Sequence, residues 1–269
     1  MIKRDSGRID VIGGRLYWEA AGRGTPLILL HGFSFDRRSW DPQMPSWTAR
    51  HRVVRYDLRG FGASTVPLQP YRHLDDLHAL IQALELRKPV LVGLSLGANV
   101  ALAYSIAHAQ EVGGLVLASP GLPGHRWRTP RPPEAAAAFA AEHGAAAAKK
   151  FWLEHPLFES LRHHPEAYRL AAAMVGDYSG WHWQNSDPQQ PGPDIRTGLP
   201  LLRVPTQVMS GDLDVEGYRQ IAEEISRAVP GAGLIRFDRG GHVMNLEEPA
   251  EFAAQVLRFI DTSIKVPYD

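Results

Sequence analysis

The sequence contains no cysteine among its 269 residues. This absence excludes disulfide bonds, metal sites built from thiolates, and a cysteine nucleophile. It leaves the compartment open, because cysteine-free proteins occur in both oxidising and reducing surroundings. Any nucleophile in this chain must therefore be another residue type.

An excess of charge of either sign is also lacking. The chain has 29 Lys plus Arg and 29 Asp plus Glu, so its formal charge is zero. A protein dedicated to nucleic acid needs a basic excess to neutralise phosphates. We therefore expect no nucleic-acid partner. Residues 122–199 hold equal numbers of basic and acidic side chains, so they do not indicate a charged substrate either.

Long hydrophobic runs are the third absence. No apolar stretch approaches the roughly 18 residues of a membrane span, and the alanine-rich run 135–141 is bounded by Glu134 and Glu142. The charged first residues do not resemble a secretory signal, which needs an apolar stretch of about 7 to 15 residues. We expect a cytoplasmic protein without a membrane partner. Hydrophobic residues still make up 44% of the chain, which indicates a globular fold.

Short apolar runs recur along the chain and predict strands. Runs that are apolar throughout are typical of strands buried on both faces of a parallel sheet. They alternate with segments of helical periodicity, and this order predicts an α/β fold. A hairpin is expected near the start, with strands 8–12 and 15–19 around the turn Gly13-Gly14. The other predicted strands are 26–30, 52–56, 89–92, 114–118, 206–209 and 234–237, and the predicted helices are 74–86, 96–109, 218–229 and 248–260.

The alternation stops between residues 122 and 199. Prolines at 123, 130, 132 and 133 open this segment, and prolines at 188, 191, 193 and 200 close it. Alanine-rich helix formers fill residues 134–150. We therefore predict a helical insertion, 122–199, in an α/β core made of residues 1–121 and 200–269.

A serine with close glycines follows one predicted strand and precedes a predicted helix. The segment reads Gly93-Leu94-Ser95-Leu96-Gly97. A serine hydroxyl stands free of a sheet only where the chain turns sharply, and the flanking glycines let strand and helix approach each other. This strand, turn and helix context indicates a nucleophile elbow with Ser95 as nucleophile.

A serine nucleophile needs a base, and the base needs an acid to fix its tautomer. His242 lies in the loop just past the predicted strand 234–237, so it can reach the carboxyl edge of the sheet. Two acids, Asp212 and Asp214, follow the strand 206–209. We favour Asp214, because Asp212 follows Gly211 directly and suits a turn-capping role. The order serine, acid, histidine is the one found in hydrolases with this kind of elbow.

Two backbone N–H donors are needed for the negative charge that develops on a substrate oxygen. One is expected from Leu96, the residue after the nucleophile, and the second from Phe33 in the loop after strand 26–30. His31 in the same loop is expected to have a structural role. The glycines of segment 57–64 fit neither the dinucleotide nor the phosphate-loop spacing, so this segment is predicted to be a structured turn.

Five motifs in order give the chain its resemblance to a known family. They are His31-Gly32-Phe33 with Trp40, Asp57-x-Arg59-Gly60-x-Gly62-x-Ser64, Gly93-x-Ser95-x-Gly97, Gly211-x-x-Asp214, and Gly241-His242 followed by Glu247-Glu248-Pro249. The sequence resembles the α/β-hydrolase superfamily over nearly its whole length. This resemblance implies a mostly parallel eight-stranded sheet, a cap inserted after the sixth strand, and catalysis without a metal or organic cofactor.

The same resemblance implies a reaction class. Ser95 in place of an aspartate separates the chain from haloalkane dehalogenases and epoxide hydrolases, so we expect a serine hydrolase of carboxylic esters or lactones. The alternatives are a slow-turnover ligand sensor, a cofactor-free haloperoxidase and a C–C bond hydrolase. Substrate contacts are expected from Val243 and Met244 beside His242 and from cap aromatics. These aromatics are Trp181 and Trp183, with Tyr178 and Trp127 as further candidates. The sequence does not indicate an oligomeric state.

Overall fold

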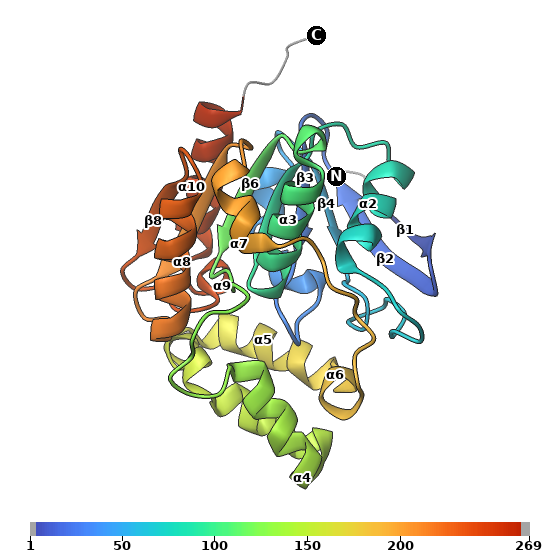
Figure 1. The fold of residues 1–269 in the computed structure, drawn as a ribbon, viewed down its shortest axis with the longest axis vertical. Helices are drawn as coiled ribbons and strands as arrows, with labels where there is room; N and C mark the ends of the chain where they lie inside the picture. Colours follow the sequence, from blue (N-terminus) through green and yellow to red (C-terminus); the bar gives the residue numbers. More distant parts are fainter. Residues whose placement is uncertain (1–3, 265–269) are drawn as a thin grey trace.

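A computed structural model describes residues 4–264 of the chain (Figure 1). Its centre is an eight-stranded sheet with the strand order β1-β2-β4-β3-β5-β6-β7-β8. Strand β2 pairs antiparallel with both β1 and β4. All other neighbouring strands pair parallel. This confirms the predicted α/β fold with a mostly parallel sheet. The strands are β1 Arg4–Val11, β2 Gly14–Ala21, β3 Pro26–Leu30, β4 Arg52–Tyr56, β5 Val90–Leu94, β6 Gly114–Ala118, β7 Thr206–Gly211 and β8 Gly233–Phe237.

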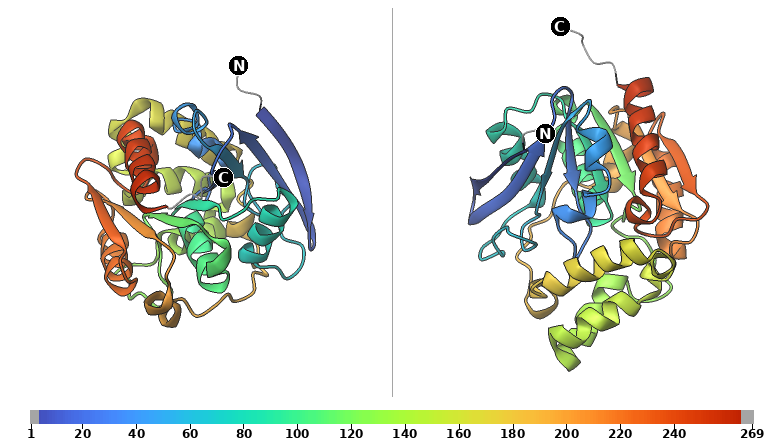
Figure 2. Two further views of the ribbon diagram at one scale, coloured as in Figure 1. Left: turned by 90° about the horizontal axis from the view of Figure 1, so that it is seen from above. Right: turned by 180° about the vertical axis from the view of Figure 1, so that it is seen from behind.

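Helices cover both faces of the sheet. α3 (Leu96–Ala107) packs against β3, β5 and β6, and α10 (Pro249–Ser263) lies on the opposite face (Figure 2). The strands between them are buried along their length, as their apolar sequences predict. Further α-helices are α1 Met44–Trp47, α2 His73–Ala83, α7 Ile195–Gly198, α8 Glu216–Ala228 and α9 Met244–Glu247. Within residues 4–264 no helix is long and apolar enough to cross a membrane.

The first hairpin turns one residue earlier than predicted. Val11 pairs with Gly14, so the turn is Ile12-Gly13 and Gly14 already belongs to β2. Gly13 has the positive φ (74°) that the turn requires. Both glycines could fill such a position, and the prediction placed the turn on the wrong pair.

Only helices and loops connect β6 to β7. The longest helix, α4 (Pro132–Glu154), contains the predicted helix 134–150 and is kinked at Gly144, where φ is 81°. α4, α5 (Pro165–Asp177) and α6 (Trp181–Gln184) lie together beyond one end of the sheet, in the lower part of Figure 1. We call these three the cap helices. The exact division of the chain at residues 122 and 199 stays a prediction.

The start of α3 lies unusually close to the sheet. Gly97 faces the carbonyl oxygens of Leu30 and His31 so closely that a Cβ at this position would overlap them. Gly93 is in the same situation, facing the backbone of Gly97 and Ala98. Two glycines four residues apart therefore let β3, β5 and α3 meet with only backbone between them.

Replacing Gly97 with Ala is predicted to lower the free energy of unfolding by about 2–3 kcal/mol, because the new Cβ forces backbone apart in a packed core. Gly176→Ala is the matched control, since this glycine is in helix α5 and a Cβ added to it would meet no atom within 4 Å. We expect that control to be neutral or slightly stabilising. Urea denaturation measures both changes, and equal effects would contradict the close approach.

Candidate active site

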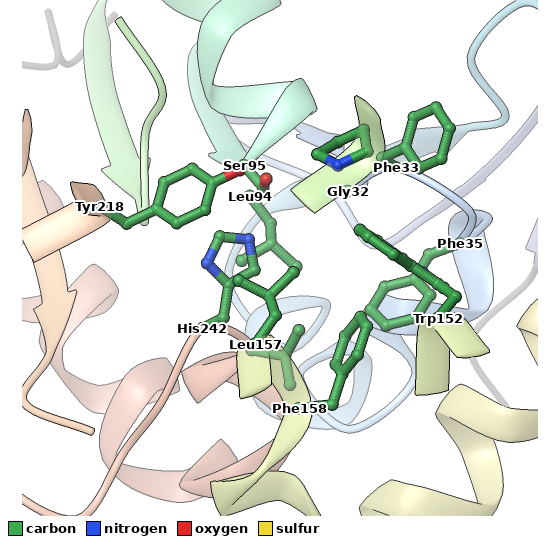
Figure 3. Close-up of a pocket in the computed structure, with 12 residues that line it drawn as sticks. Gly32, Phe33, Phe35, Leu94, Ser95, Trp152, Leu157, Phe158, Tyr218 and His242 are labelled. Carbon is green, nitrogen blue, oxygen red and sulfur yellow. The ribbon is translucent and has the colours of Figure 1, made fainter. Parts of the chain in front are cut away.

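Ser95 lies at the junction of β5 and α3, where the chain reverses direction. Its φ of 51° and ψ of −109° are a conformation that residues with a side chain rarely adopt. The Ser95 N–H donates to the carbonyl of Ala118 in the neighbouring strand (2.9 Å), and its own carbonyl accepts from Asn99. These bonds hold the turn, so that the hydroxyl stands at the carboxyl edge of the sheet (Figure 3).

Asp214 and His242 come from the loops after β7 and β8. His242 Nδ1 is 2.9 Å from Asp214 Oδ2, and both side chains are almost completely buried. A further bond joins the two loops, because Leu213 N–H donates to the carbonyl of Gly240 (3.0 Å). The structure thus brings the predicted acid and base into direct contact. His242 also lines one cavity together with Ser95 (Figure 3).

A buried glutamate holds the loop that carries His242. Glu247 accepts hydrogen bonds from Gly241 N–H and from the Ser160 hydroxyl, the latter at 2.9 Å. Burial raises the pKa of the Glu247 carboxyl, and these two bonds oppose that effect. Ser160 belongs to the segment between α4 and α5, so Glu247 ties the histidine loop to the cap region.

The other residues considered for acid and base lie in different surroundings. Asp212 is partly exposed and forms an ion pair with Arg236 (3.3 Å). His31 is fully buried, with Nδ1 2.8 Å from the Gly32 carbonyl and Nε2 accepting from Leu58 N–H. Burial lowers the pKa of His31. A neutral imidazole bonded at both nitrogens matches the structural role expected for it.

Phe33 and Leu96, the predicted oxyanion donors, line the wall of one cavity together with Ser95. The loop after β3 that holds Phe33 is fixed to a cap helix. Trp152 of α4 donates from its indole Nε1 to the Ser34 hydroxyl (2.7 Å), and the Phe33 ring packs edge-on against Trp152. The position of this loop therefore depends on α4.

A small cavity, which we call the notch, opens between Ser95 and His242. Its volume is about 10 Å³, which is room for about one water molecule. Apart from Ser95, His242 and Tyr218 its walls are apolar (Figure 3). The wall residues are Gly32, Phe33, Phe35, Leu94, Pro133, Trp152, Leu157, Phe158 and Val243.

A much larger cavity of about 470 Å³ meets the notch at Ser95. We call it the main cavity. Cap residues such as Ala137 and core residues such as Val100 line it together with polar side chains. Two histidines in its wall are buried, and burial lowers the pKa of His73 to about 3 and that of His182 to about 4. Both are therefore neutral near pH 7.

Tyr218 is a site residue that the sequence did not reveal. It lines both cavities, its hydroxyl lies beside the Ser95 side chain (Figure 3), and the centroid of its ring lies 4.3 Å from the centroid of the His242 ring. Burial raises the pKa of the phenol, which therefore keeps its proton at neutral pH. In sequence it is only one apolar position of an amphipathic helix, so no local signal marks it.

The predicted substrate contacts are only partly found at these cavities. Val243 lines the notch. Trp181, Trp183 and Met244 are not among the residues that line the notch or the main cavity. Trp183 and Met244 are buried in packing instead. Contact of these three with a substrate stays a prediction that neither cavity supports.

One group of side chains in the described chain has donor atoms close enough for a metal ion. His78, His108 and Glu111 place their ligand atoms within 4.8 Å of one another. His108 follows the last residue of α3, whereas Ser95 precedes the first. The twelve-residue helix between them spans about 18 Å. A metal at this group would therefore be remote from Ser95.

Comparison with known proteins agrees with this architecture. The AB hydrolase superfamily protein YisY of Bacillus subtilis (strain 168) is 27% identical over 260 residues, which cover 91% of this chain and 94% of the relative. An esterase from Thermogutta terrifontis superposes with a TM-score of 0.82 at 25% identity, covering 97% of this chain and all of the esterase. Est816, described as an N-acyl homoserine lactone degrading enzyme, superposes with a TM-score of 0.80 at 26% identity, over 94% and 100% of the two chains.

The family assignment follows from the match over most of the chain. Residues 27–255 match the model of the alpha/beta hydrolase family. This range includes the serine turn, the acid and the histidine loop described above. The chain belongs to the alpha/beta hydrolase family.

Proposed function

We propose that this hydrolase cleaves carboxylic esters or lactones, with Ser95 as nucleophile, His242 as general base and Asp214 as the orienting acid. One observation carries the proposal. His242 Nδ1 lies 2.9 Å from Asp214 Oδ2 while the same imidazole shares the notch with Ser95. The similarity to an esterase and to a lactone-degrading enzyme supports the substrate class.

The first half of the proposed reaction forms an acyl-enzyme. Ser95 Oγ attacks the carbonyl carbon, and its proton passes to His242 Nε2. The bond from the carbonyl carbon to the alcohol oxygen then breaks, and His242 gives the proton to this leaving oxygen. Asp214 keeps Nδ1 protonated, so that Nε2 is free to accept. The contact at 2.9 Å is the geometry that this role requires.

The second half uses water. A water oxygen attacks the acyl carbon while His242 accepts its proton, and the bond to Ser95 Oγ breaks as the proton returns to the serine. In both halves negative charge develops on the carbonyl oxygen. The backbone N–H groups of Phe33 and Leu96 are the proposed donors to this oxygen. The products are a carboxylic acid and an alcohol, or a single hydroxy acid when the substrate is a lactone.

The proposal predicts that Ser95→Ala lowers ester hydrolysis by about 10⁴-fold or more, because the nucleophile is lost. Labelling by a fluorophosphonate probe should also disappear. Ser46→Ala is the matched control, since Ser46 is exposed on α1 and bonds only to the Gln43 carbonyl. A pH-stat assay with methyl and ethyl esters and small lactones measures the hydrolysis. Undiminished activity of Ser95→Ala would refute the mechanism.

Tyr218→Phe tests the hydroxyl that contacts Ser95 while keeping the ring beside His242. In the proposed mechanism the phenol donates to Ser95 Oγ and leaves the serine proton directed at His242, so its loss should slow attack. We expect kcat/KM to fall about tenfold, the value of one ordinary hydrogen bond. The rate of fluorophosphonate labelling should fall by a similar factor, because both reactions need the same attack. Unchanged rates in both assays would show that the hydroxyl plays no part.

A further inference from the structure

The two cavities that meet at Ser95 differ in their relation to His242. The notch is lined by both Ser95 and His242, whereas the main cavity is lined by Ser95 but not by His242. They also differ in size, about 10 Å³ against about 470 Å³. An ester bound across Ser95 must therefore direct its two halves into spaces of very different volume.

The chemistry decides which half enters which cavity. In the tetrahedral intermediate the leaving oxygen takes its proton from the imidazole, so it must lie within hydrogen-bond reach of His242. The acyl group receives no proton and has no such requirement. The alcohol half therefore lies on the notch side of Ser95, and the acyl half extends into the main cavity.

We infer that the preferred substrates are esters of a small alcohol, such as methanol, with a large carboxylic acid. This inference rests on the proposed function, because it uses Ser95 as nucleophile and His242 as the proton donor. The notch has room for about one water molecule, and a methyl group is of comparable size. The main cavity has the volume of a pocket for a medium-sized organic group.

The second half of the reaction supports the same assignment. The water that hydrolyses the acyl-enzyme must give its proton to His242, so it enters where the alcohol has left. A water-sized space with an imidazole in its wall suits that step. In each turnover the small alcohol leaves the notch and a water molecule takes its place. The acyl group stays in the main cavity during this exchange.

The walls of the notch resist enlargement. Trp152, Leu157 and Phe158 are each at most 2% exposed. The rings of Trp152 and Phe158 meet edge-to-face at 5.3 Å, and the indole is held by its bond to Ser34. A larger alcohol would have to displace packed side chains, which costs free energy in a dense interior. The notch is thus a size filter for the alcohol.

The main cavity suits an acyl group that has both apolar and hydrogen-bonding parts. Its wall combines apolar side chains with hydrogen-bonding ones such as Asn99. Arg72 and Arg131 also line it, but each is paired with a neighbouring acid, Asp75 or Glu134. Glu134 and Asp187 line the same wall, so two acids match its two cations and the wall does not single out an anionic acyl group.

Two isomeric esters test the assignment directly. Methyl heptanoate and hexyl acetate have the same formula, but the large group is on the acyl side in one and on the alcohol side in the other. We expect kcat/KM for methyl heptanoate to exceed that for hexyl acetate by more than about tenfold, since even one methylene in a hydrophobic pocket discriminates by that factor. Equal rates, or a preference for hexyl acetate, would overturn the inference.

Two variants locate the filter. The substrates are methyl, ethyl and propyl heptanoate, and the measured quantity is the ratio of kcat/KM for the methyl ester to kcat/KM for the propyl ester. Leu157→Ala, which enlarges the notch, should lower this ratio by at least about fivefold. Ala137→Phe in the main cavity should lower the rates of all three esters together and leave their ratios unchanged. The inference fails if Ala137→Phe changes the alcohol preference and Leu157→Ala does not.

Labelling separates this inference from the proposed function. If the fluorophosphonate labels Ser95 and hydrolysis needs Ser95, but large alcohols are preferred, then the proposed function stands and the inference is wrong. If the wild-type protein is neither labelled nor active on either isomer, the proposed function is wrong and the inference fails with it. Ser95→Ala is measured alongside in both cases.

Discussion

A close backbone approach between α3 and the strands of the sheet is the constraint on which the site depends. Gly97 at the start of α3 touches the end of β3, and Gly93 at the end of β5 touches α3. This arrangement puts the serine turn and the loop carrying Phe33 side by side. A side chain at either glycine would push helix and strands apart, and the hydroxyl of Ser95 would no longer meet the loops from the neighbouring strands.

The parallel sheet brings the other residues of the site together. β3, β5, β7 and β8 all end at the same edge, so residues far apart in the chain follow them into one region. Hydrogen bonds between loops then set the details: Leu213 bonds to Gly240, and Glu247 holds Gly241. The imidazole of His242 is fixed by its own loop, by Asp214 and by the ring of Tyr218.

The sequence predicts those parts of the fold that depend on residues close together in the chain. Apolar runs mark the strands, and the glycines around Ser95 mark the turn, because both depend on neighbouring residues. The turn of the first hairpin is predicted one residue too late, because Gly13 and Gly14 are both glycines and either could take the positive φ of the turn. Tyr218 and the notch wall residues Trp152, Leu157 and Phe158 cannot be identified from the sequence, because nothing local distinguishes a side chain that packs from one that lines a cavity. The positions of Trp181 and Trp183 depend likewise on how the cap helices pack.

The bond between Trp152 and Ser34 links two parts of the molecule that have different tasks. An outward movement of α4 that separates the indole from the hydroxyl breaks this buried bond, at a cost of about 1–3 kcal/mol for the polar atoms left without a partner. The same movement releases the loop that carries Phe33. In the proposed mechanism, entry of a substrate past α4 and stabilisation of its oxyanion by Phe33 are then thermodynamically coupled, because one hydrogen bond joins the helix to the loop.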